Sequence, residues 1–146
     1  MRRRCCLLVA ALATFAGLVP PAPAAAAAEP TVQARSSSYG RIVVDRKGLT
    51  LYAFTRDGRG RSRCYGACAR AWPPLLTEQR PRAGRGVRGA LLGTTGRRDG
   101  TRQVTYRGRP LYYYVRERRP GQIFCQNVVG FGGTWLLVSP RGAVIR

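Results

Sequence analysis

The heptapeptide Leu51-Tyr52-Ala53-Phe54-Thr55-Arg56-Asp57 decides the fold, because a near copy returns sixty positions later as Leu111-Tyr112-Tyr113-Tyr114-Val115-Arg116-Glu117. The same shift places Gly48 on Gly108. Each copy then continues to a cysteine and a tryptophan: Cys64 with Trp72, and Cys125 with Trp135. Two copies are too few for an elongated solenoid, which needs about three or more repeats to bury a continuous core. The sequence therefore predicts two related units that pack on each other.

Short strands joined by turns are expected within each unit. Residues 41–46 are rich in β-branched side chains, Lys47-Gly48 suits a turn, and residues 49–55 suit the partner strand. Alternation in that second strand places apolar side chains on both of its faces, so both faces should be covered. We therefore expect an all-β fold of two pseudo-repeated hairpin units, packed as one small sandwich or barrel-like domain. A short helical turn is expected near residues 64–71.

The motif residues are expected to be mainly structural. Buried aromatic side chains supply much of the apolar burial of a small domain. The expected core aromatics are Tyr52, Phe54, Tyr112 and Tyr114, with Trp72 and Trp135 as anchors. Asp57 should cap its loop or pair with an arginine, because one carboxylate is a poor calcium site. The second copy has Glu117 in that place, and its longer side chain argues against a role common to both acids.

Several motifs in the same order resemble a known family. They occupy residues 52–57, 64–75, 98–106 and 131–135. Together they are similar to the bacterial secreted-repeat family, described as predicted lipoproteins with a Tyr-x-(Phe/Trp/Tyr)-x-x-Asp motif. The resemblance covers roughly residues 40–142, which is nearly all of the chain after the predicted signal, and it implies an exported envelope protein without an established biochemical role.

The first 28 residues have the pattern of a secretory signal peptide. Three arginines precede an apolar run from Cys5 to Leu18, and small residues at Ala24–Ala28 offer cleavage sites. An uncleaved anchor is the alternative, but the run is shorter than the 20 or so residues that span a membrane. No cysteine stands immediately after the apolar region, where lipid modification requires one, so we do not expect a lipid anchor. The expected location is secreted or associated with the cell envelope.

The rest of the chain divides by composition. We expect residues 29–39 to be a flexible lead-in, because they are polar, contain a serine run and lack apolar periodicity. Residues 40–146 should form a single domain with repeats at 40–76 and 99–139. A basic connector at 77–98 joins them, and its first part would carry any contact with a polyanion.

The charge balance limits the class of partner. The chain has 26 basic and 6 acidic residues; without the three arginines of the predicted signal, 23 and 6 remain, a net charge of +17. Such a balance favours anionic envelope polymers or a lipid surface as partners. Coding bias on a solvated surface is the alternative, because Lys47 is the sole lysine. No motif typical of nucleic-acid-binding folds is present, so no specific nucleic acid is expected.

Three cysteines follow the predicted signal, at positions 64, 68 and 125. An exported chain favours a disulfide between Cys64 and Cys68. In a regular helix their Cβ atoms would lie about 6 Å apart, beyond the roughly 3.8 Å of a disulfide, but Gly66 can break such a helix. A redox or soft-metal site and free thiols are the other possibilities. Cys125 is then left free, pairs with Cys64 or Cys68, or links two chains into a dimer.

The absence of histidine narrows the function. It excludes histidine-dependent hydrolysis, histidine-ligated zinc and haem held by an axial histidine. The acids at positions 45, 57, 99 and 117 lack the spacing of a catalytic pair, so we expect no enzyme and no cofactor. The first hypothesis is a secreted, envelope-associated binding or structural module, with Tyr112, Tyr113 and Tyr114 stacking on sugars if they are exposed. The alternative is an extracytoplasmic redox or soft-metal protein that uses the cysteine loops.

Overall fold

The computed structural model describes residues 31–146, so the predicted signal peptide and the first residues of the predicted lead-in lie outside the described part. The elements are β1 (Val32–Ser37), β2 (Gly40–Asp45), β3 (Tyr52–Phe54), α1 (Ala67–Ala71), the 3-10 turn η1 (Gly89–Leu91), β4 (Leu92–Gly96), β5 (Arg102–Tyr106), β6 (Arg109–Pro110), β7 (Val128–Gly130) and β8 (Gly133–Leu137).

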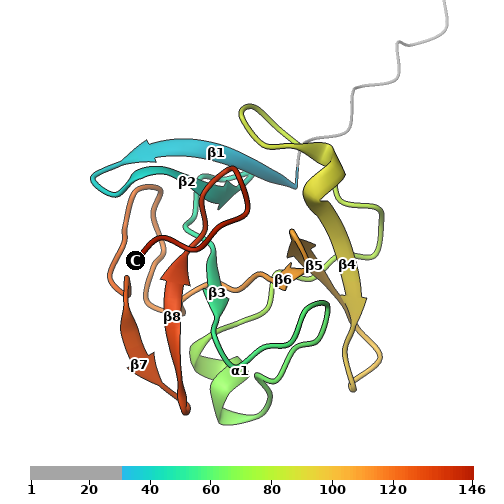
Figure 1. The fold of residues 1–146 in the computed structure, drawn as a ribbon. Helices are drawn as coiled ribbons and strands as arrows, with labels where there is room; N and C mark the ends of the chain where they lie inside the picture. The colour runs from blue at the N-terminus through green and yellow to red at the C-terminus, as the bar shows by residue number, and fades with distance from the viewer. Residues whose placement is uncertain (1–30) are drawn as a thin grey trace, which may run out of the picture.

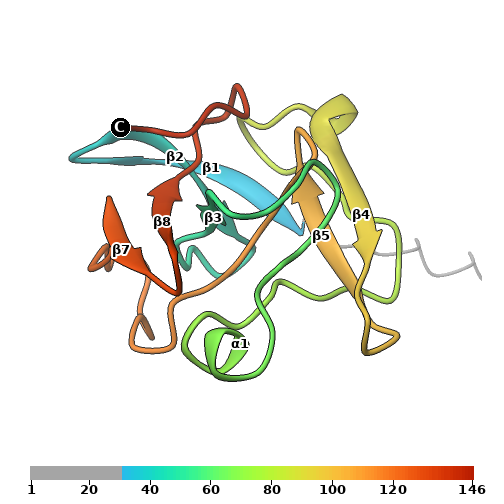
Figure 2. The ribbon, with the colours of Figure 1, turned by 60° about the horizontal axis from the view of Figure 1, so that its bottom comes forward.

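Three small antiparallel sheets surround a common core (Figure 1). They have the strand orders β1-β2, β3-β8-β7 and β4-β5-β6. Figure 2 shows β7 and β8 on one side of the molecule, β4 and β5 on the other, and α1 at one end. Within residues 31–146 the sheets do not close into a barrel. The expected all-β fold with one short helical turn is confirmed, the turn being α1.

An approximate two-fold relation joins the two units at the motif tyrosines. Tyr52 and Tyr112 exchange both backbone hydrogen bonds, with N···O distances of 2.8 and 3.0 Å. The residue before each tyrosine donates to the preceding strand of its own unit, Leu51 to Val43 and Leu111 to Val104. The repeat in the sequence is therefore a structural pair that meets along its own motif.

The segment that closes each unit also forms backbone hydrogen bonds with a strand of the other unit. Strand β3 of the first unit pairs with β8 of the second, so that Phe54 lies opposite Trp135. Val138, just after β8, accepts a hydrogen bond from Val43 at 2.8 Å, and Leu75 at the end of the first unit accepts the equivalent bond from Val104 at 2.8 Å. The two units are thus interlocked.

Both faces of β3 are covered, as the alternation predicts. Tyr52 and Phe54 belong to one buried cluster, which contains both tryptophans. Ala53 belongs to a second cluster on the opposite face, together with the preceding Leu51. Side chains of both units contribute to each cluster.

The prediction of a flexible lead-in at 29–39 is wrong for the residues that the structure describes. Residues 32–37 form β1, which pairs with β2 in continuous register from Val32 opposite Asp45 to Ser37 opposite Gly40. Apolar periodicity is lacking because the far end of this hairpin is exposed. There, the Ser37 hydroxyl donates to the Gly40 carbonyl oxygen at 2.8 Å and accepts from the Tyr39 N–H. Ser37 therefore stabilises a turn.

The connector predicted at 77–98 is also partly wrong. Its middle lies along the outer edge of β1, where Ala34 N–H donates to Arg85 O and Gly84 N–H donates to Val32 O. Its end forms η1 and β4, and β4 pairs with β5 from Leu92 opposite Tyr106 to Gly96 opposite Arg102. The second unit therefore begins with β4, the counterpart of β1, and not at residue 99.

Candidate functional site

The aromatics that recur in the two units form one pseudo-symmetric stack. The rings of Trp72 and Trp135 lie parallel, with centroids 3.9 Å apart. Phe54 stacks on the outer face of this pair beside Trp135 at 4.2 Å, and Tyr114 extends it beside Trp72 at 4.8 Å. The rings of Tyr52 and Tyr112 lie nearly perpendicular to those of Trp72 and Trp135, respectively, at interplanar angles of 79° and 89°. The motif aromatics therefore build the core, as predicted.

The tyrosine of each motif donates to the acid of the other motif. Tyr52 Oη donates to Glu117 Oε1 at 2.6 Å, and Tyr112 Oη donates to Asp57 Oδ2 at 2.7 Å. Each acid also fixes the loop before its own unit's cysteine, by accepting the N–H of Arg63 at 2.7 Å or of Phe124 at 2.6 Å. The expectation that the two acids share no role is wrong, because the added methylene of Glu117 still reaches both equivalent donors.

Asp57 and Glu117 differ in how many of their carboxylate oxygens accept a hydrogen bond. Asp57 uses one oxygen for each bond, whereas Glu117 accepts both bonds on Oε1. Glu117 Oε2 is buried and has no hydrogen-bond partner among the described residues. Burial raises the pKa of both carboxyls, and it raises the pKa of the Tyr52 and Tyr112 hydroxyls as well. The tyrosines therefore remain neutral donors at ordinary pH.

Cys64 and Cys68 form the expected disulfide, with Cα atoms 5.2 Å apart. The helix starts at Ala67, after Gly66 at a φ of 56°, so Cys64 lies outside it. A φ in this left-handed region favours glycine. The break therefore brings the two sulfur atoms closer than a regular helix would.

Cys125 is a buried free thiol, so of the three possibilities left open for it, the bond to Cys64 or Cys68 is not formed. Its counterpart in the first unit is Cys64. The first unit continues into α1 with Cys68, whereas the second continues into β7, where no second cysteine stands. Burial raises the pKa of the Cys125 thiol and lowers its reactivity.

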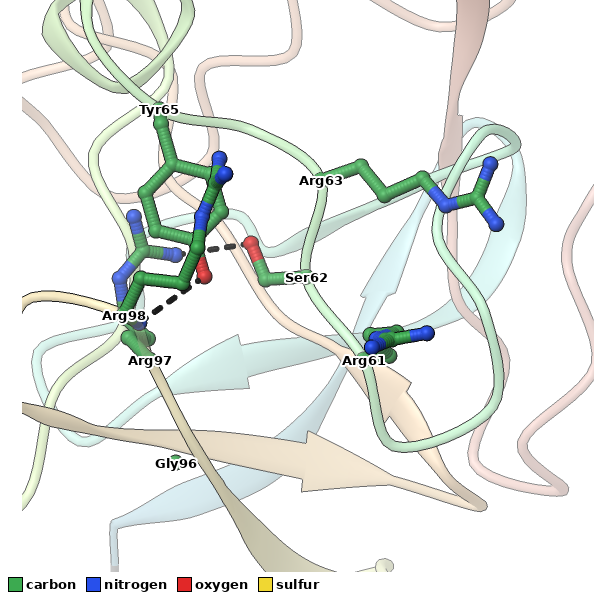
Figure 3. A pocket seen from close by; sticks show the side chains of 7 residues that line it. All are labelled: Arg61, Ser62, Arg63, Tyr65, Gly96, Arg97 and Arg98. Carbon is green, nitrogen blue, oxygen red and sulfur yellow. Dashed lines mark hydrogen bonds between the residues drawn. The ribbon is translucent and has the colours of Figure 1, made fainter.

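A pocket of about 510 Å³ opens between the Cys64 loop and the β4–β5 turn (Figure 3). The loop contributes Arg61, Ser62, Arg63 and Tyr65, and the turn contributes Gly96, Arg97 and Arg98. No acidic side chain is among these lining residues. We call this site the arginine pocket.

Arg97 lies buried at the base of the arginine pocket, and its bonds are mostly to neutral acceptors. Its guanidinium donates to Ser62 Oγ at 2.9 Å, to Gln103 Oε1 at 2.7 Å and to the Cys64 carbonyl oxygen at 2.8 Å. Its Nε lies 3.5 Å from Oδ2 of the exposed Asp99, an ion pair too long for a hydrogen bond. The carboxylates of Asp99 and Asp57 act on this buried cation through their charge, whereas these three hydrogen bonds all go to neutral acceptors.

The other arginines of the pocket are exposed, and one is held in place. The Arg98 guanidinium lies over the Tyr65 ring at 4.1 Å from its centroid, and its backbone N–H donates to Tyr65 Oη at 3.3 Å. The Arg97 guanidinium lies 4.4 Å from the same centroid. Cation–π contacts of this kind orient a guanidinium without neutralising it.

A chain of hydrogen bonds joins the arginine pocket to the motif. Arg97 donates to Ser62 Oγ, which lies 2.7 Å from Tyr112 Oη, and Tyr112 donates to Asp57. The structure thus places two predicted site residues, Tyr112 and Asp57, directly behind the pocket. Sequence reasoning missed Ser62, Arg97 and Gln103, because nothing distinguishes Arg97 among so many arginines.

Other predicted contacts have a different outcome. Tyr112 is fully buried and Tyr113 and Tyr114 are half-buried, so none offers an open face for a sugar. No group of three His, Cys, Asp or Glu side chains that could hold a metal ion occurs within residues 31–146. In the same range, no helix has the length and apolar character needed to cross a membrane.

Comparison with known families supports the repeat. The model of a family described as a secreted repeat of unknown function matches residues 33–76 and again residues 93–139. The chain belongs to this family. Each match to the secreted-repeat family starts within the first strand of a unit, β1 or β4, in agreement with the corrected boundaries. The chain matches no curated protein and no solved structure.

Proposed function

We propose that this protein is a secreted, non-enzymatic binding module of the cell envelope that holds anionic polymers in the arginine pocket. The observation that carries the proposal is the buried Arg97 guanidinium, which has mainly neutral partners at the base of a pocket with three exposed arginines. Gathering like charges is unfavourable unless an anion compensates them. Guanidinium groups bind phosphate, sulfate and carboxylate groups through paired hydrogen bonds.

The position of the pocket supports a site that is ready before the ligand arrives. Its two walls come from different repeats, and the interlocked core fixes them relative to each other. Arg98 is oriented by Tyr65, and Ser62 is fixed through Tyr112. A preformed site loses little conformational entropy on binding, which favours affinity.

The test is calorimetric titration with short-chain inorganic polyphosphate, a simple stand-in for phosphate-bearing envelope polymers. The variant Arg61→Gln/Arg98→Gln removes two exposed charges from the pocket. Its control, Arg80→Gln/Arg82→Gln, removes two charges from the exposed connector, to which the sequence alone assigns the polyanion contact. We expect the pocket variant to weaken binding about tenfold or more, because each charge-assisted hydrogen bond contributes roughly 1.5–3 kcal/mol.

The control variant should change the affinity by less than about threefold, a shift of roughly 0.65 kcal/mol. Equal losses of affinity in the two variants would show that the arginine pocket is not the binding site and that the interaction depends on net charge alone. Titrations at rising salt give a second test: binding that persists at high salt supports specific recognition, because interactions between exposed charges are largely screened beyond about 8 Å at 0.15 M ionic strength.

The alternative function in the cysteine loops stays a prediction. With the Cys64–Cys68 disulfide formed, neither sulfur is a thiolate that could bind a soft metal. A dimer linked through Cys125 also stays a prediction, although the burial of that thiol works against it.

A further inference from the structure

A second pocket stands at the place equivalent to the arginine pocket in the other half of the molecule. It has a volume of about 530 Å³ and lies between the Cys125 loop and the β1–β2 turn. The equivalence follows from the strand register. Ser36 pairs with Arg41 in the first hairpin, and their counterparts Gly96 and Arg102 pair in the second. Counted forward from Ser36 and Gly96, Gly40 and Gly100 correspond, with φ of 83° and 82°, and the second turn has one further residue, Thr101.

The side chains of this pocket, which we call the aromatic groove, differ in kind from those of its counterpart. In the loop, Arg61, Ser62 and Arg63 are replaced by Gln122, Ile123 and Phe124; in the turn, Arg97, Arg98 and Asp99 are replaced by Ser37, Ser38 and Tyr39. The base changes as well, because the polar Gln103 has Ile42 as its counterpart. The two units therefore have a pocket at the same place but line it with different kinds of side chain.

The aromatic groove exposes two large rings that the core does not use. Tyr39 is 45% exposed and Phe124 is 57% exposed. Both line the same cavity, together with three consecutive serines, Ser36, Ser37 and Ser38. The backbone beneath each ring is fixed, because Tyr39 N–H donates to Ser37 Oγ and Phe124 N–H donates to Glu117 Oε1. Hydrogen bonds therefore fix the backbone positions from which both rings extend.

One charged side chain lines the aromatic groove. The Arg35 guanidinium lies close to Gly121, 3.3 Å from the position that a Cβ on this glycine would occupy. It therefore forms part of the wall beside the Cys125 loop. No acidic residue lines the groove. A ligand that complements this site needs an apolar face for the rings, hydroxyls for the serines and a negative group for Arg35.

We propose that the aromatic groove binds an acidic saccharide, with sugar rings packed on Tyr39 and Phe124 and a carboxylate paired with Arg35. Sugar rings present C–H groups on their flat faces and hydroxyls at their edges. The C–H groups pack against aromatic faces, and the sugar hydroxyls form hydrogen bonds with serine hydroxyls. A uronic acid adds the carboxylate, which a guanidinium recognises through paired hydrogen bonds. This site does not depend on the arginine pocket.

The test is calorimetric titration of the full mature chain with a tetrasaccharide of galacturonic acid, with the neutral maltotetraose for comparison. Tyr39→Ala and Phe124→Ala should each weaken binding of the acidic tetrasaccharide about tenfold. Arg35→Gln should remove the preference for the acidic over the neutral tetrasaccharide. Val129→Ala is the control, because Val129 is 78% exposed and lies outside the groove.

Because both rings are exposed, Tyr39→Ala and Phe124→Ala should leave the protein folded, so weaker binding would not come from unfolding. Polyphosphate titration of the same variants checks this independently. Unchanged polyphosphate affinity with loss of the tetrasaccharide supports the groove. The proposal is overturned if the protein does not bind the tetrasaccharide. It is also overturned if Tyr39→Ala and Phe124→Ala bind it like the control while Arg61→Gln/Arg98→Gln loses it.

Discussion

The two tyrosine–acid pairs differ by one methylene, whereas the two pockets next to them differ in charge, polarity and aromatic content. Tyr52 and Glu117 on one side repeat the contacts of Tyr112 and Asp57 on the other, including the backbone bond to the loop before the cysteine. Those same loops then present arginines in one copy and Phe124 in the other. The shared parts hold the fold, and the divergent parts are where we place binding.

This difference shows what a repeat motif can mean. The motif residues look like a site because they recur, but they recur because the two units interlock through them. An acid at this position satisfies the tyrosine of the opposite unit and fixes the loop of its own. The residues that differ between the copies therefore carry more information about ligands than the residues that agree.

The largest expected effect comes from breaking the shared core. Trp135→Ala removes the ring that contacts Trp72, Phe54 and Tyr112, and should destabilise the protein by about 3–5 kcal/mol. Urea denaturation followed by circular dichroism measures it. Val129→Ala should stay within about 0.5 kcal/mol of the wild type, because that side chain is exposed. A Trp135→Ala protein as stable as this control would contradict a shared core.

The next effect is alkaline unfolding driven by the two motif tyrosines. Burial raises the pKa of both hydroxyls, so above pH 10 the unfolded chain releases protons that the folded chain keeps. Each tyrosine then lowers the free energy of unfolding by about 1.4 kcal/mol per pH unit. We expect stability to fall steeply above pH 10. In Tyr52→Phe/Tyr112→Phe the profile should flatten but keep the part due to Tyr113, whose pKa burial also raises; a profile as steep as the wild type's would contradict the assignment.

The smallest of these effects separates the two acids. Burial raises the pKa of both carboxyls, so the folded state binds more protons above the unfolded values of about 3.9 and 4.3. Stability therefore falls as pH rises from there through the folded pKa. Glu117→Gln and Asp57→Asn keep an acceptor oxygen and remove this titration.

Flattening should be greater for Glu117→Gln than for Asp57→Asn, because Glu117 Oε2 lacks a partner whereas Arg63 and Arg97 also act on Asp57. Denaturant titrations between pH 4 and 8 measure both profiles. Equal flattening would show that the added methylene makes no electrostatic difference.

The sequence predicts the repeat, the all-β class, the core aromatics and the Cys64–Cys68 disulfide, because periodic aromatics and a glycine between cysteines carry local signals. It does not predict β1, since Ser37 stabilises a turn and the serine run leaves no alternation to detect. The crossed bonds from Tyr52 to Glu117 and from Tyr112 to Asp57 join residues far apart in the chain. Only the three-dimensional arrangement of the units reveals them, and the same holds for the pocket around Arg97.

The most direct test of this account is a two-by-two titration. Arg61→Gln/Arg98→Gln and Tyr39→Ala/Phe124→Ala are each titrated with polyphosphate and with the galacturonic acid tetrasaccharide. We predict that each variant loses about tenfold or more in affinity for its own ligand and much less in affinity for the other. Parallel losses for both ligands in either variant would contradict the claim that two equivalent pockets have diverged to bind different chemistry.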